Sequence, residues 1–205
     1  LRRRAHDTVN LDPWPLQLTP VRRLAGGPIV FSRESSQGSA LGPPVVLVHG
    51  LGTSSLYMVP TAERLAADFP VYALDLPGFG HSSKPSHALD LPALAEVLAS
   101  WMRAAGLESA AMVGNSLGCQ VIAEFGVRYP QRLRRAVLQG PTMDGYARTN
   151  LRQFGRFVRD LPRERVPEYF INGHDYLRTG LHRGWETMQI ALADRIEEKL
   201  PRLSM

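Results

Sequence analysis

Short apolar runs alternate with amphipathic stretches through the middle of the chain. The runs at residues 44–48, 71–74, 111–113 and 135–138 are dominated by aliphatic residues, a composition typical of strands buried on both faces of a parallel sheet. The stretches between them carry apolar residues at helical spacing. The pattern predicts a doubly wound, mainly parallel α/β sheet with right-handed crossovers.

The helices of this core are predicted at residues 56–67, 90–105 and from Leu117 to about residue 130. Asp90 can cap the second helix and Gly106 can end it. A β-hairpin that turns at Gly26-Gly27 is expected before the first parallel strand.

The two ends of the chain lack the alternation. Residues 1–20 contain three prolines and no periodicity, which indicates an irregular arm. After Gly140 the pattern is helical only, at residues 146–161 and again at about 183–200. The last helix places apolar residues on one stripe, which indicates packing first and a substrate cavity second; these are Trp185, Met188, Leu192, Ile196 and Leu200.

We therefore expect three regions: an arm over residues 1–20, an α/β core over residues 21–141 and a helical cap over residues 142–205. At 205 residues and 44% hydrophobic content, the chain can bury one well-packed domain. Each apolar run is shorter than the roughly 18 residues that a membrane span requires. The first residues lack the apolar stretch of a secretory signal, so we expect a cytoplasmic protein without a membrane span.

The net charge and the cysteine content limit which partners and which covalent links we expect. The formal charge of +5 comes from arginines that are interleaved with acids and apolar residues, so we expect no nucleic-acid partner. Cys119 is the one cysteine in the sequence, which excludes an intrachain disulfide. It follows a predicted strand and turn inside a helix, and we expect a buried, inert thiol.

Candidate chemistry gathers where the predicted strands end. His49, Asp75, Ser116 and Gly140 each follow a predicted strand, the edge at which open α/β sheets bind ligands. Ser116 stands in Gly114-Asn115-Ser116-Leu117-Gly118, between a strand and a helix. A Gly-x-Ser-x-Gly turn in this place exposes the serine hydroxyl above the sheet. The pattern predicts a nucleophile.

The loop from Gly50 to Ser55 permits a second interpretation. Gly50-Leu51-Gly52 follows a strand and precedes a helix, and Asp75 ends the next strand, as in a dinucleotide-binding fingerprint. Ser55 stands where that fingerprint needs its third glycine, and His49 and Ser116 are left unexplained. A dinucleotide-binding oxidoreductase is therefore the less favoured alternative.

Three motifs together resemble the α/β-hydrolase superfamily, specifically its capped serine hydrolases. His49-Gly50-Leu51-Gly52 is similar to the oxyanion loop, Asp75-Leu76-Pro77-Gly78-Phe79-Gly80-His81-Ser82 to the D-x-P-G-x-G-x-S segment, and residues 114–118 to the nucleophile elbow. They occur in the family's order, each at the end of a predicted strand. The resemblance covers residues 21–140, and residues 141–205 are similar only as a helical cap.

The resemblance implies an acyl-transfer site. Ser116 Oγ is expected to attack an ester, lactone, thioester, amide or diketone carbonyl of a small, mostly apolar substrate, with no cofactor or metal. The oxyanion is expected to bind the N–H groups of Leu51 and Leu117. His49, Asp75 and His81 are expected to shape loops. The residues also considered for substrate binding are His49, Gly50, Gly52, Asn115 and Trp185.

In this family an acid and a histidine base activate the serine nucleophile, and these two residues are harder to place in the sequence. The family carries them on loops after two further strands beyond the cap, and residues 141–205 contain no such pattern. Asp144 is the candidate acid, whereas His174 and Asp175 lie in a segment with helical flanks and His182 precedes the last helix. We hypothesise that the sequence is about the N-terminal two thirds of a serine hydrolase. The alternative is a hydrolase-like binding protein or inactive fragment, and neither substrate nor oligomeric state can be read from the sequence.

Overall fold

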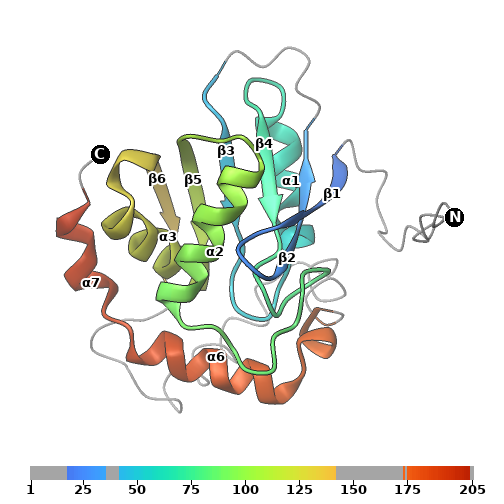
Figure 1. The fold of residues 1–205 in the computed structure, drawn as a ribbon, viewed down its shortest axis with the longest axis vertical. Coiled ribbons are helices and arrows are strands. Elements are labelled where there is room, and N and C mark those ends of the chain that lie inside the picture. The colour runs from blue at the N-terminus through green and yellow to red at the C-terminus, as the bar shows by residue number, and fades with distance from the viewer. Residues whose placement is uncertain (1–17, 36–41, 142–172, 174, 204–205) are drawn as a thin grey trace, which may run out of the picture.

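A six-stranded mixed sheet forms the centre of the molecule (Figure 1). The computed structural model describes residues 18–35, 42–141, 173 and 175–203. The strand order is β1-β2-β4-β3-β5-β6. The strands are β1 (Thr19–Leu24), β2 (Ile29–Glu34), β3 (Val45–Val48), β4 (Val71–Leu74), β5 (Ala110–Asn115) and β6 (Leu133–Gln139).

The four strands from β3 to β6 are parallel, whereas the β1–β2 hairpin joins β4 antiparallel. The predicted α/β fold with a mainly parallel sheet is therefore confirmed. β1 begins at Thr19, so residues 19 and 20 belong to the sheet and not to the irregular arm that the prolines suggested. Leu18 of that arm is described and buried, and residues 1–17 lie outside the described residues.

Two apolar cores cover the two faces of the sheet. Helices α2 (Leu91–Ala104) and α3 (Leu117–Arg128) pack on one face, and α1 (Ser55–Leu65) packs on the other (Figure 1). Successive side chains of a strand point to opposite faces, so Val46 and Val48 join the first core while Val45 and Leu47 join the second. This explains why the central strands are apolar at every position.

The expected helix ends are present in α2. Asp90 is its N-cap, and the carboxylate accepts the Ala93 N–H at 2.8 Å. The helix ends at Ala104, just before Gly106. Trp101, on the inner face of α2, is fully buried against the ring of Tyr72 from β4. This packing fixes α2 against the sheet.

The residues after 173 form helices beside the carboxyl edge of the sheet (Figure 1). We call residues 175–203 the cap segment. It contains α6 (Leu181–Ala193), the short α7 (Ile196–Lys199) and a 3-10 turn (Leu200–Arg202). The helix predicted at 146–161 lies outside the described residues. Within them, none of the helices is both long and apolar enough to cross a bilayer.

The single helix predicted at 183–200 is wrong, because the chain breaks at Asp194. This residue is extended, with φ −73° and ψ 144°. Its carboxylate accepts hydrogen bonds from Gln120 of α3, at 3.1 Å, and from Lys199. Before the break, Met188 and Leu192 pack against the main core, whereas Trp185 is exposed. A contact with a residue of α3, distant in sequence, therefore overrides the local helical pattern.

Candidate functional site

Ser116 has a strained backbone at the junction of β5 and α3. Its φ is 51° and its ψ is −116°, and among the described residues it is the one non-glycine residue with a positive φ. Such a conformation costs about 1–3 kcal/mol and persists only where surrounding contacts enforce it. The elbow predicted at this position therefore has the sharp turn that its sequence pattern implies.

Contacts on both sides hold the turn. The Ser116 N–H donates to the Gln139 carbonyl of β6 at 3.0 Å, and the Ser116 carbonyl accepts the Cys119 N–H at 2.9 Å. A Cβ at Gly118 would lie 2.1 Å from the Val48 carbonyl oxygen of β3. Glycine is therefore required there, because any side chain would push α3 away from the sheet.

The loop after β3 lies directly against the elbow. A Cβ at Gly50 would lie 3.0 Å from Asn115 Oδ1 and 3.1 Å from Ser116 Cβ. The structure thus brings together Gly50, Asn115 and Ser116. Leu51 follows Gly50 in this loop, and Leu117 opens α3, where main-chain N–H groups and the helix dipole favour negative charge. The assignment of the Leu51 and Leu117 N–H groups to an oxyanion hole stays a prediction.

His49 is fully buried and joins two loops. Its Nε2 accepts the Leu76 N–H at 2.9 Å, which leaves the proton on Nδ1, and Nδ1 donates to the Gly50 carbonyl at 2.7 Å. Burial lowers the pKa of His49, although the charges of Asp75 and Asp175 and the bond to Gly50 oppose that shift. The ring is therefore neutral with both nitrogens engaged, which fits a loop-shaping residue better than a substrate ligand.

Asp75 also serves the loops. One carboxylate oxygen accepts the Ser55 N–H at the start of α1, and the other accepts the His81 N–H, each at 2.7 Å. The buried guanidinium of Arg33 lies 3.9 Å from the same carboxylate. The Asp75 carbonyl accepts the Ser82 hydroxyl at 2.6 Å. These contacts agree with the predicted loop-shaping role of the D-x-P-G-x-G-x-S segment.

A tyrosine of the cap segment lies against the loop after β3. Gly52 has a φ of 78°, and a Cβ there would lie 2.2 Å from Cε1 of Tyr176. The neighbouring Asp175 is buried, and its charge acts on His49. Sequence analysis missed Tyr176, because no motif marks it and only the fold brings it to Gly52.

The remaining predicted site residues are spread out. Trp185 lies on α6 and is 58% exposed, and its role in substrate binding stays a prediction. His182 is exposed on the same helix, with Nδ1 3.9 Å from Glu186. Asp144 and His174 lie outside the described residues. The assignment of Asp144 as the acid therefore stays a prediction.

Cys119 has the buried position that was expected. Its Sγ lies 3.3 Å from the Gly114 carbonyl oxygen and 3.4 Å from that of Gln139. Burial raises the pKa of the thiol to about 11. At neutral pH the thiol is protonated, and it cannot compete with Ser116 as a nucleophile.

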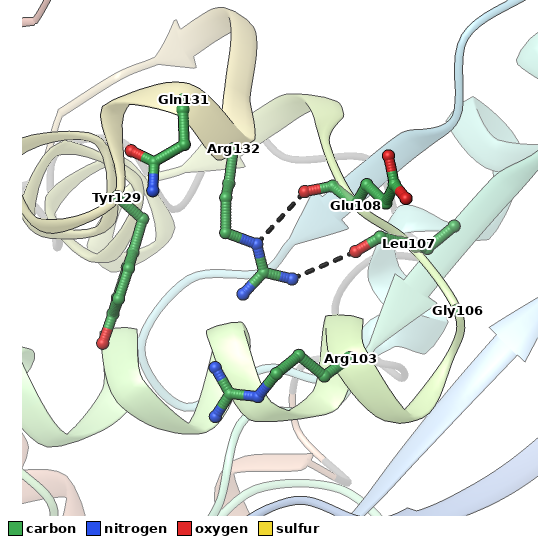
Figure 2. A pocket seen from close by; sticks show the side chains of 7 residues that line it. All are labelled: Arg103, Gly106, Leu107, Glu108, Tyr129, Gln131 and Arg132. Atoms are coloured by element: carbon green, nitrogen blue, oxygen red, sulfur yellow. Dashed lines mark hydrogen bonds between the residues drawn. The ribbon is translucent and has the colours of Figure 1, made fainter.

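A surface hollow of about 680 Å³ lies far from Ser116, before the start of β5 and β6 (Figure 2). Arg132 crosses its floor and donates to the carbonyls of Ala99 and Leu107 at 3.0 Å and of Glu108 at 3.1 Å. The guanidinium thus satisfies carbonyl groups of α2 and of the turn that follows it. The hollow offers no nucleophile, and we do not place the active site there. Among the described residues, no cluster of three His, Cys, Asp or Glu could hold a metal ion.

Comparison with known proteins agrees with this geometry. The model of the α/β hydrolase fold family matches residues 43–202. The rat (Rattus norvegicus) protein named 1-acylglycerol-3-phosphate O-acyltransferase ABHD5 is 31% identical over 133 residues, which cover 63% of this chain and 38% of that protein. The chain thus matches well under half of this relative's length.

Solved structures resemble the chain over most of its length. The crystal structure of a bacterial membrane phospholipase A covers 92% of this chain and 67% of its own, with a TM-score of 0.72 and 21% identity. The enol-lactonase from Burkholderia xenovorans covers 90% of this chain and 78% of its own, with a TM-score of 0.68 and 18% identity. At these identities the likeness concerns the fold.

Proposed function

The chain belongs to the α/β-hydrolase family, and we propose that it is a serine hydrolase that acts through an acyl-enzyme at Ser116. The observation that carries this proposal is the strained backbone of Ser116, with φ 51° and ψ −116°. Local strain at a polar residue is tolerated where function requires it. If Ser116 only closed a turn, a glycine could adopt the same backbone angles without strain.

In the proposed reaction, Ser116 Oγ attacks the carbonyl carbon of a small, mostly apolar ester, lactone or thioester, or of a diketone that undergoes C–C cleavage. The carbonyl oxygen becomes an oxyanion, which accepts hydrogen bonds from the N–H groups of Leu51 and Leu117. The carbonyl re-forms as the bond to the leaving group breaks, the leaving group takes up the proton that Ser116 lost to the base, and water then hydrolyses the acyl-enzyme. Tyr176, against Gly52, forms part of the apolar wall beside the oxyanion loop.

The serine proton must pass to a base. His49 is not that base, because its ring nitrogens bind Leu76 and Gly50. Asp144 is retained as the proposed acid, and the base is not assigned. The division into an arm (1–20), a core (21–141) and a cap (142–205) is part of the same proposal, and no cofactor is invoked.

The named relative suggests a second candidate, acyl transfer to an alcohol. The rat protein is named as an acyltransferase of 1-acylglycerol 3-phosphate. The same acyl-enzyme would form at Ser116, but an acceptor hydroxyl would replace water in the second step. A binding protein without turnover is the alternative from a different class.

Labelling with a fluorophosphonate probe tests the nucleophile. We expect covalent labelling of the wild-type chain, loss of labelling in Ser116→Ala and Ser116→Gly, and full labelling in the control Ser109→Ala, which changes a serine before β5. Ser116→Gly is also expected to raise the free energy of unfolding by about 1 kcal/mol, because glycine relieves the strain.

The outcome separates the candidates. Equal labelling of wild type and Ser116→Ala, or no labelling of the folded wild type when the chain is extended to the full length of the hydrolase, would contradict the proposal and favour a binding protein. Release of the acyl group from a p-nitrophenyl ester to water supports hydrolysis. Its transfer to added 1-acylglycerol 3-phosphate supports the second candidate.

A further inference from the structure

Apolar and aromatic side chains in the first part of the cap segment are exposed. Leu177 is 86% exposed, Leu181 95%, Trp185 58% and Tyr176 40%. We call these four residues the cap patch. Leu181 and Trp185 are four residues apart on α6 and therefore share one face of the helix. The opposite face carries the buried Thr187 and Ala191.

Helix α6 is bonded to the rest of the fold, although Leu181 and Trp185 are exposed. Gln120 of α3 donates to the Ala191 carbonyl at 2.9 Å, and Glu186 accepts the Ala88 N–H at 2.9 Å. Arg183 donates to the carbonyls of Pro85 and His87. The helix is thus held along its length, and Leu181 and Trp185 in its first half stay exposed, whereas Met188 and Leu192 farther along the same stripe pack against the core. Grouped exposed apolar residues on a monomer mark a binding surface.

Two cations, Lys84 and Arg178, border the patch at Leu177. Lys84 donates to the Arg178 carbonyl, next to Leu177 in sequence. Arg183 is two residues from both Leu181 and Trp185, about half a turn around α6, and bonds the loop at Pro85 and His87. Partial burial, and then the charges of Arg178 and Arg183, lower the pKa of Lys84, which shows that the three charges are close together. Within the part of the chain that the structure describes, no carboxylate lies within salt-bridge distance of any of them. Glu186, the nearby acid, binds His87 and Ala88.

Apolar side chains beside unneutralised cations fit an anionic lipid surface. Leucine and tryptophan enter the boundary between headgroups and acyl chains, and lysine and arginine meet the phosphates. A purely apolar partner would leave the cations without counter-charge, and an acidic peptide would leave the leucines in water. We propose that the cap patch docks this protein on anionic phospholipid membranes.

Vesicle co-sedimentation of the full chain tests this proposal. We expect binding to vesicles that contain phosphatidylglycerol, weaker binding to pure phosphatidylcholine and a decrease as salt is raised. The double variant Leu177→Ser/Leu181→Ser should lose at least about tenfold in partitioning, because two leucines no longer enter the bilayer. Lys84→Gln should lose about fivefold, on anionic vesicles only.

Matched controls separate docking from unfolding and from catalysis. Leu24→Ser changes a leucine that is 68% exposed on the β1–β2 hairpin, and it should bind as wild type does. Ser116→Ala should also bind fully, so that a failure of the proposed hydrolase function does not affect this result. Circular dichroism should show the same unfolding midpoint for the double variant and the wild type.

Two results would overturn the proposal. One is equal partitioning of Leu177→Ser/Leu181→Ser and Leu24→Ser, or no binding of the wild type to anionic vesicles. The other is a concentration-dependent dimer in sedimentation equilibrium that the double variant abolishes, which would identify the patch as an interface between two copies of the chain.

Discussion

The elbow and the cap segment lie close together, yet different forces hold them. Around Ser116, main-chain groups of β3, β5 and α3 approach so closely that Gly118 has no space for a methyl group. The cap segment is attached by side-chain bonds instead, such as Gln120 to Ala191 and Lys199 to Glu124 at 2.7 Å. Ser116 therefore stands where main-chain groups leave no free space, whereas the cap segment is attached through side chains, apolar ones such as Met188 and polar ones such as Gln120.

The largest effect is expected at the close approach of α3 to β3. Gly118→Ala should lower the free energy of unfolding by about 3 kcal/mol, because the added Cβ would meet the Val48 carbonyl. Urea denaturation measures this loss.

The matched control is Gly184→Ala in α6, where a Cβ would meet no atom within 4 Å. Alanine there should be neutral or stabilise the protein by up to about 1 kcal/mol, because it favours the helix. Similar losses at the two positions would mean that the elbow and the cap segment are packed alike, against the difference described here.

An intermediate effect is expected from pH through His49. Burial lowers its folded-state pKa, so the unfolded chain binds a proton near pH 6.5 that the folded chain does not. The free energy of unfolding should therefore fall as the pH drops below about 6.5, by up to about 1.4 kcal/mol per pH unit, until the folded-state pKa is reached.

Urea denaturation over a pH series would measure this slope, and His49→Gln should flatten it. The absolute stability of the variant is not the test, because glutamine makes other hydrogen bonds. A slope unchanged by His49→Gln would show that another group causes the pH dependence.

The smallest global effect is expected in the cap segment. Lys199→Met removes the partner of Glu124 and Asp194, and the local opening free energy of α7 should fall by about 1 kcal/mol. Amide hydrogen exchange should then be about fivefold faster in α7 and unchanged in α2. Arg195→Met, which removes an exposed pair with Glu198, should leave the exchange of α7 almost as in wild type.

The sequence predicted the core because its signals are local. β4 has the predicted bounds, Asp90 caps α2, and the elbow pattern identified the strained residue. The interpretation of His49 and Asp75 as loop-shaping residues was also within reach, because each follows a strand beside a glycine-containing loop.

The cap segment could not be predicted in the same way, because distant contacts decide it. Asp194 breaks the expected helix to reach Gln120, and Tyr176 meets Gly52 across the fold. Neither pairing leaves a periodic trace in the sequence. Trp185, predicted on an apolar packing stripe, is exposed, although Met188 and Leu192 of the same stripe pack against the core.

Cys119 has a practical consequence for experiments on the cap segment. With a pKa of about 11 and no exposed surface, about one in ten thousand of these thiols is ionised at pH 7. Maleimide reagents should leave the native protein almost unmodified. A cysteine introduced by Trp185→Cys would therefore be the dominant reactive thiol, so that an environment-sensitive dye attached there could report lipid contact without removal of the native cysteine.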